Sequence, residues 1–328
     1  MKAILFILST LVFSLFFTSC GVKKDSEAKN VILKTGEFKL SVPGGNIWYK
    51  VSGTSKGTPV VLLHGGPGMS SFYLKPFEEL GNDRQVVRYD QLGGGKSDVI
   101  TDTTMFTIDH FVRELDSLRT FLKLPKWHVF GHSWGTIVAL EYYRAYPERV
   151  ASLTFGSLCF DIPGWEQSTR HLLTTLPDSL QEAVTKAELT GRYDEPAYQE
   201  AMNIFYSLYV WRRPVQADLD SMFATYNAGI YSYMWGPSEF SITGTLKNYD
   251  ATSLLPNIKV PTLFTVGEFD EISVQAVKGL ATKVPDARFA MFPGSSHMTP
   301  WDARDENIKV VREFLQFADS LNSQVYKH

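Results

Sequence analysis

A serine with the surroundings of a nucleophile lies near the middle of the chain. Ser133 is the centre of a Gly-His-Ser-Trp-Gly sequence at residues 131–135, after an apolar run at 127–130 and before a helical run at 136–146. A sharp turn between a strand and a helix needs flanking glycines, and it presents the serine hydroxyl at the N-terminus of the helix. Such a hydroxyl can attack a carbonyl carbon if a base takes its proton. The competing interpretation is an ordinary glycine-rich loop.

This chemistry also requires a base and an acid, expected in the chain order serine, acid, histidine. Of the seven histidines, His297 is the one that lies in a loop after a predicted strand and downstream of Ser133. Asp270 follows the strand predicted at 262–266, and it would fix the tautomer of the imidazole and stabilise the imidazolium. Glu268 is the nearest rival, but Asp270 lies further into the loop. The predicted catalytic residues are therefore Ser133, Asp270 and His297.

The negative charge that develops on an attacked carbonyl oxygen needs N–H donors placed in advance. The backbone N–H of Trp134, directly after the serine, is one candidate. The other is expected from Gly65 and Gly66, in the His-Gly-Gly-Pro-Gly sequence that follows the strand at 60–63. A phosphate-binding loop is a weaker alternative, because neither the Gly-Lys-Ser/Thr ending nor the dinucleotide spacing is present.

Elements that could position these residues alternate along the chain. Two segments at 38–42 and 47–51, separated by Pro-Gly-Gly-Asn, predict a β-hairpin. Further strands are predicted at 60–63, 85–89, 127–130, 153–155, 262–266 and 288–292. Because helical stretches separate these apolar runs, the pattern indicates an α/β fold with a mainly parallel sheet and helices on both faces. The interval 161–250 lacks strand signals and is rich in aromatic residues, so it predicts a helical cap inserted between two parts of the core, 36–160 and 251–328.

Composition excludes several classes of protein and of site. The 328 residues carry 32 Lys+Arg and 35 Asp+Glu, a net charge of −3, so there is no basic excess for nucleic acid. Two cysteines cannot build a disulfide framework or a Cys-based zinc site. Cys159 lies in an apolar segment and is expected to be an inert buried thiol.

The N-terminus has the pattern of an export signal. An apolar run at 3–17 follows Met1-Lys2 and ends in Thr-Ser-Cys, which predicts a signal peptide over residues 1–20 and a polar linker over 21–35. The sequence before Cys20 resembles the lipobox of bacterial lipoproteins, although Phe17 stands where leucine is usual. That resemblance implies an exported protein held at a membrane by lipid on Cys20. A plain secretory signal is the alternative.

Four motifs together resemble the proline iminopeptidase family of serine peptidases. They are His-Gly-Gly-Pro-Gly at 64–68, Asp-Gln-Leu-Gly-Gly-Gly-Lys-Ser at 90–97, Gly-His-Ser-Trp-Gly at 131–135 and Gly-Glu-Phe-Asp-Glu at 267–271. The resemblance runs from about residue 36 to the C-terminus and implies an α/β-hydrolase fold with a helical cap. It departs at 92–96, where the family often has arginine after the glutamine and serine or cysteine between the glycines.

The resemblance also implies a substrate. Met-Trp-Gly-Pro-Ser-Glu-Phe at 234–240 resembles a cap motif of the tricorn-interacting aminopeptidase branch, in which two glutamates hold the substrate's α-ammonium group. Those positions are Glu239 and Glu271 in this chain. The family thus implies a serine exo-aminopeptidase that acts on short peptides with a free N-terminus and needs no metal or organic cofactor. The residue that it releases is expected to be proline or another small or apolar residue. An esterase or amidase on the same fold is the alternative, and a non-catalytic surface binding protein is a third hypothesis.

Overall fold

An eight-stranded sheet forms the centre of the protein. The computed structural model describes residues 31–325, with side chains up to residue 322. The strands are β1 (Gly36–Val42), β2 (Gly45–Ser52), β3 (Gly57–Leu63), β4 (Arg84–Asp90), β5 (Trp127–His132), β6 (Val150–Gly156), β7 (Thr262–Gly267) and β8 (Arg288–Phe292). Their order is β1-β2-β4-β3-β5-β6-β7-β8. The hairpin β1–β2 and the pair β2–β4 are antiparallel, and every other pair is parallel, which confirms the predicted mainly parallel α/β sheet.

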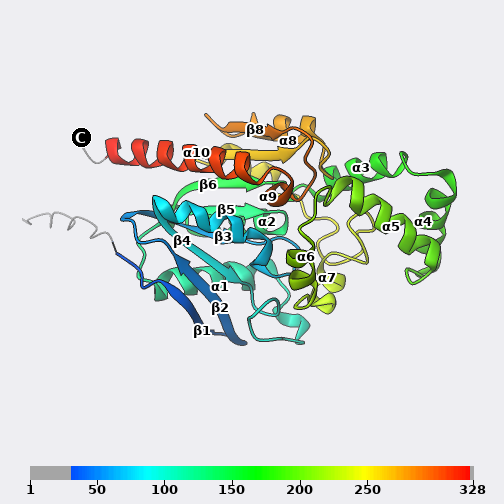
Figure 1. The fold of residues 1–328 in the computed structure, drawn as a ribbon, viewed down its shortest axis with the longest axis horizontal. Coiled ribbons are helices and arrows are strands. Elements are labelled where there is room, and N and C mark those ends of the chain that lie inside the picture. The colour runs from blue at the N-terminus through cyan, green and yellow to red at the C-terminus, as the bar shows by residue number, and fades with distance from the viewer. Residues whose placement is uncertain (1–30, 326–328) are drawn as a thin grey trace, which may run out of the picture.

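Helices connect and cover these strands (Figure 1). The α-helices are α1 (Ile108–Phe121), α2 (Trp134–Ala145), α3 (Ile162–Leu173), α4 (Asp178–Thr190), α5 (Pro196–Tyr209), α6 (Gln216–Phe223), α7 (Ala228–Met234), α8 (Val274–Ala281), α9 (Thr299–Asp302) and α10 (Arg304–Val325). The 3-10 helices are η1 (Ser71–Asn82), η2 (Thr103–Met105), η3 (Pro147–Arg149) and η4 (Thr252–Asn257). None of the helices within 31–325 combines the length and the apolar character needed to cross a membrane.

The sheet separates two apolar cores. Val60 and Leu62 of β3 pack in the core that contains residues of η1 and α10. Val61 and Leu63 of the same strand pack in the core that contains residues of α1, α2 and α8. Successive side chains of a strand point to opposite faces, so a strand covered on both faces must be apolar at every position. β8 differs because it is an edge strand, and most of its residues are exposed or half-buried.

The predicted insertion forms five helices, α3 to α7, between β6 and β7. Its two ends meet in an isolated antiparallel bridge between Asp161 and Asp250. Figure 1 shows α3, α4 and α5 together at one end of the molecule, away from the C-terminal end of α10. Because β6 ends at Gly156 and α3 begins at Ile162, the cap leaves the core at the carboxyl end of a parallel strand. Ligands of open α/β sheets bind at this end.

The chain is attached to the body before the first strand begins. Leu33 is buried, its N–H donates to Oε1 of Gln85, and its carbonyl oxygen accepts from Nε2 of the same side chain, at 2.7 and 2.8 Å. Part of the linker predicted over 21–35 is therefore packed on the body of the protein, at Leu33. Residues 1–30, which hold the predicted signal peptide and Cys20, lie outside the described part of the chain.

Candidate active site

Ser133 occupies a strained turn between β5 and α2. Its backbone has φ 54° and ψ −126°, a conformation that non-glycine residues rarely adopt. A Cβ at Gly131 would lie 2.3 Å from the carbonyl oxygen of Gly135, and one at Gly135 would lie 2.3 Å from the carbonyl oxygen of Leu63. Both flanking glycines are thus required because backbone atoms approach them closely. The turn places Ser133 at the start of α2, as expected for a nucleophile elbow.

His297 and Asp270 meet on the loops that follow β8 and β7. Nδ1 of His297 is 2.9 Å from Oδ1 of Asp270, and both side chains are buried. Burial opposes ionisation of Asp270, but attraction to His297 and hydrogen bonds, including one from the backbone N–H of Gly267, outweigh it, so the pKa of Asp270 is lowered. The rival Glu268 instead accepts a hydrogen bond from the backbone N–H of Gly294. The geometry therefore favours Asp270 as the partner of His297.

The loop that carries His297 is tied to the turn that carries Ser133. The ring of His132, the residue before the serine, lies 5.0 Å from the His297 ring. The backbone N–H of Ser133 donates to the carbonyl oxygen of Gly156, and the hydroxyl of Ser157 donates to the carbonyl oxygen of His297. Elements from opposite halves of the chain thus place serine and histidine in one cluster.

The predicted oxyanion loop packs directly on the serine. A Cβ at Gly65 would lie 2.7 Å from Cβ of Ser133. The two predicted glycines are not equivalent, because the N–H of Gly65 donates to the hydroxyl of Tyr73 at 2.6 Å. The Gly65 N–H is therefore already used in a hydrogen bond within the fold, which corrects its predicted role as a donor to the oxyanion. The N–H groups of Gly66 and Trp134 are the better pair of candidate donors.

Glu239 and Glu271 converge on the same cluster. Glu271 is fully buried, neither of its carboxylate oxygens has a hydrogen-bond partner among the described residues, and Oε2 lies 3.6 Å from Nδ1 of His297. Glu239 is half-buried, and its Oε1 accepts a hydrogen bond from Tyr231 at 2.6 Å. Burial, the charge of Glu239 and the charge of Asp270 raise the pKa of Glu271 well above its usual value. Burial also raises the pKa of Glu239.

A buried carboxylate without a partner is unfavourable unless it is neutralised. Two adjacent carboxyls of raised pKa therefore form a site that favours a bound cation, which would satisfy both. Cys159 lies in the same region but is fully buried, and burial together with nearby carboxylates raises the pKa of its thiol well above the usual value. The buried thiol is in the protonated form that lacks nucleophilic character, as expected.

Gln91 and Trp165 are neighbours of the site that were not among the predicted site residues. Oε1 of Gln91 accepts from Nε1 of Trp134 at 2.7 Å, and Nε2 of Gln91 donates to the carbonyl oxygen of His64 at 3.2 Å. Trp165, from the cap helix α3, packs edge-on against His297 with ring centroids 5.3 Å apart. Gln91 lies inside the motif at 90–97, which is a signal for it in the sequence. Nothing in the local sequence distinguishes Trp165 from the other aromatic residues of the cap.

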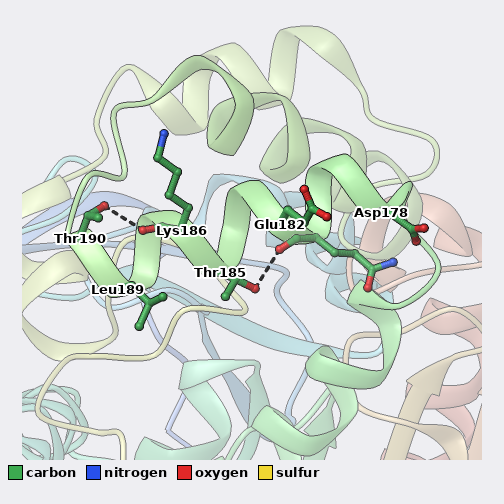
Figure 2. Close-up of a pocket in the computed structure, with 7 residues that line it drawn as sticks. Asp178, Glu182, Thr185, Lys186, Leu189 and Thr190 are labelled. Atoms are coloured by element: carbon green, nitrogen blue, oxygen red, sulfur yellow. Dashed lines mark hydrogen bonds between the residues drawn. The ribbon is translucent and has the colours of Figure 1, made fainter.

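Within 31–325 no three side chains of His, Cys, Asp and Glu are grouped so that they could hold a metal ion. A shallow hollow lies along one face of α4, where residues of that helix alone line it (Figure 2). It contains none of the predicted site residues, and its side chains include the exposed Glu182, Lys186 and Leu189.

Comparison with known proteins identifies relatives over most of the chain. Residues 58–303 match the model of the alpha/beta hydrolase fold family. A proline iminopeptidase from Heyndrickxia coagulans is 39% identical over 279 residues, which cover 84% of this chain and 97% of the relative. A proline iminopeptidase from Saccharolobus solfataricus is 36% identical over 289 residues, which cover 85% of this chain and 92% of the relative.

Solved structures agree with this relationship. The proline iminopeptidase of Mycobacterium smegmatis superposes with a TM-score of 0.79 at 29% identity, over 88% of this chain and all of the other. The structure of VinJ superposes with a TM-score of 0.82 at 31% identity, over 86% of this chain and 99% of the other. An esterase from Thermogutta terrifontis, at 23% identity and a TM-score of 0.63, shares the fold. The chain belongs to the proline iminopeptidase family of α/β-hydrolases.

Proposed function

We propose that this protein is a serine exo-aminopeptidase that releases an N-terminal proline, or another small apolar residue, from short peptides. The observation that carries the proposal is the convergence of Glu239 and Glu271 on the His297–Asp270 pair. Hydrolysis of simple esters does not require two carboxylates beside the catalytic base. An aminopeptidase must attract an ammonium group one residue from the scissile carbonyl, and the identity to proline iminopeptidases supports this reading.

In the proposed mechanism, Oγ of Ser133 attacks the carbonyl carbon of the first peptide bond and His297 takes the hydroxyl proton. Asp270, bonded to Nδ1, holds the imidazole with Nε2 free for this transfer and stabilises the imidazolium. The N–H groups of Gly66 and Trp134 stabilise the oxyanion. His297 then protonates the departing amine. In the second half of the reaction His297 takes a proton from water, which attacks the acyl carbonyl carbon, and then returns that proton to Oγ of Ser133 as the free amino acid leaves.

Recognition rests on charge and on the aromatic cap. A substrate ammonium between Glu239 and Glu271 gains at most several kcal/mol from each carboxylate at an effective dielectric constant of about 20. A peptide without a free amine would leave the buried Glu271 and the half-buried Glu239 without a compensating positive charge, so internal segments and blocked N-termini are excluded. Trp165 and Trp235, whose ring centroids are 5.6 Å apart, supply an apolar wall suited to a compact ring such as proline.

The test compares proline, alanine and phenylalanine arylamides, each with a free and with an acetylated amino group. We expect turnover of the free-amine substrates only, with the proline or alanine derivative preferred, and none by Ser133→Ala, whose thermal unfolding should match that of the parent. Turnover confined to acetylated arylamides or simple esters would replace the proposal with a general esterase or amidase. Failure of a fluorophosphonate to label folded protein at Ser133 would indicate a non-catalytic binding protein.

We also propose that the protein is exported and held at a membrane by lipid on Cys20. The support is the sequence of residues 1–20, in which small residues precede the cysteine at the end of an apolar run. Several acyl chains would anchor the protein while the catalytic body remains in water. Radiolabelled palmitate supplied to a producing bacterium should enter the full chain but not Cys20→Ala. Unlabelled, soluble protein that has lost its signal peptide would indicate a plain secretory signal instead.

A further inference from the structure

A chain of three buried hydrogen bonds runs beside the candidate active site. The backbone N–H of Gly65 donates to the hydroxyl of Tyr73 at 2.6 Å. That hydroxyl lies 2.9 Å from Nδ1 of His132, and Nε2 of His132 lies 2.9 Å from the carbonyl oxygen of His297. The side chains of Tyr73 and His132 are buried, at 2% and 1% exposure, so water does not compete for these bonds.

Only one arrangement of protons satisfies all three bonds. The carbonyl oxygen of His297 can only accept, so Nε2 of His132 must carry a proton. Burial, reinforced by the neighbouring His297, lowers the pKa of His132 to about 3, so the ring is neutral and its Nδ1 is an acceptor. Tyr73 therefore donates its hydroxyl proton to Nδ1 and accepts from Gly65. Each donor and acceptor of this hydrogen-bond chain then has a partner, and all three bonds are donated in the same direction, from the loop of Gly65 to the loop of His297.

These bonds connect three loops that carry separate parts of the reaction. Gly65 lies after β3 in the candidate oxyanion loop, His132 ends β5 next to Ser133, and His297 lies after β8. The strands themselves are held by the sheet, whereas the loops beyond their ends depend on hydrogen bonds such as these and the one from Ser157 to the His297 carbonyl oxygen. A displacement of about 1 Å in a catalytic group can cost a hundredfold in rate. The chain spans these loops without contributing a reacting atom.

We propose that Tyr73 and His132 are positioning residues that hold the oxyanion loop and the His297 loop in register with Ser133. The hydroxyl of Tyr73 accepts the hydrogen bond of the Gly65 N–H. The N–H of the next residue, Gly66 at φ +50°, is therefore the one available to the oxyanion. His132 ties the backbone of His297 to the residue preceding the nucleophile. The inference rests on the proposed Ser133 mechanism but not on amine recognition, because an oxyanion forms in every acyl transfer.

The test removes the hydroxyl of Tyr73 while retaining its ring. For Tyr73→Phe we expect kcat to fall about ten- to hundredfold, with KM changed less than about threefold, both on a free-amine arylamide and on p-nitrophenyl acetate. Tyr142→Phe is the matched control, because Tyr142 is equally buried and donates to Asp116 at 3.1 Å elsewhere in the molecule. This control should keep the parental kcat. Equal kcat values for Tyr73→Phe, Tyr142→Phe and the parent would overturn the proposal.

A second readout does not depend on the Tyr73 variant folding. Nitrogen-15 NMR of the parent should show His132 as the neutral ring protonated at Nε2, without titration between pH 8 and pH 5. Protonation at Nδ1, or titration within that range, would contradict the proposed chain. His132→Gln, which restores an N–H near the His297 carbonyl, should retain more kcat than His132→Phe, whereas equal loss in both would reduce His132 to a packing residue. A parent that cleaves p-nitrophenyl acetate but no free-amine substrate would refute the aminopeptidase function alone.

Discussion

At the scale of single residues, substitutions of Glu239 and Glu271 test substrate binding separately from the catalytic steps. Glu239→Gln and Glu271→Gln keep the shape of the side chains but remove the charge that would hold the substrate's ammonium group. We expect KM for free-amine arylamides to rise about ten- to hundredfold, equivalent to about 1.4–2.8 kcal/mol, while hydrolysis of p-nitrophenyl acetate changes less than about threefold. Glu182→Gln on the exposed face of α4 is the control. Equal losses on both substrates would refute the amine-binding role.

The raised pKa values of the same pair predict a pH dependence of binding. Burial raises the pKa of both carboxyls above the ordinary glutamate value of about 4.3, and the charges of Glu239 and Asp270 raise the pKa of Glu271 further. A protonated pair lacks charge, so KM for free-amine substrates should rise as pH falls, beginning above that ordinary value. KM for a neutral ester should stay flat over the same range. Parallel pH profiles for the two substrates would show that the pair does not bind the amine.

At the scale of elements, the turn at Ser133 depends on close contact between β3, β5 and α2. A methyl group at residue 135 would lie 2.3 Å from the carbonyl oxygen of Leu63, so Gly135→Ala must push α2 away from β3. We expect about 1–3 kcal/mol of destabilisation from this overpacking, with loss of most activity because Ser133 is displaced. Gly279→Ala in α8, where a Cβ meets nothing within 4 Å, is the matched control. It should be neutral or stabilising by up to about 1 kcal/mol in denaturant unfolding.

The cap supplies side chains that contact both His297 and Glu239. Trp165 of α3 packs on His297, and its Nε1 donates to the backbone carbonyl oxygen of Glu239 at 3.1 Å. Tyr231 of α7 donates to the carboxylate of the same glutamate. The cap therefore contributes one of the two proposed amine ligands and the supports that orient it, whereas Glu271 comes from the core loop that also carries Asp270.

At the scale of the whole molecule, α10 is anchored to the sheet by polar contacts with two buried side chains. Asp319 lies 3.0 Å from both Nη1 of Arg84 and Nε2 of His128, on β4 and β5. Asp319→Ala removes the acceptor from two buried groups, which should lower the free energy of unfolding by about 1–3 kcal/mol. Asp305→Ala, on the exposed start of the same helix, should change it little. Denaturant unfolding of the two variants measures the difference, and equal stabilities would refute the anchor.

Local patterns in the sequence predicted the strands, the turn at Ser133, the insertion and the positions of Asp270 and His297. These features depend on short-range causes: apolar runs specify strands covered on both faces, and glycines specify the sharp turn. The chain order serine, acid, histidine then limited the candidates for the acid and the base. Their positions after predicted strands limited them further, because catalytic side chains gather at the carboxyl ends of parallel strands. The resemblance to proline iminopeptidases added Glu239 and Glu271, which no local pattern distinguishes from surface acids.

Which hydrogen bonds and packing contacts these residues make depends on the tertiary structure. The commitment of the Gly65 N–H to Tyr73, the packing of Trp165 on His297 and the bonding of Leu33 to Gln85 all join positions that composition and periodicity treat as independent. A hydrogen bond exists or fails within a few tenths of an ångström. That geometry is set by the packing of whole elements, so one sequence motif can offer two glycine N–H groups while the folded chain uses one of them for its own support.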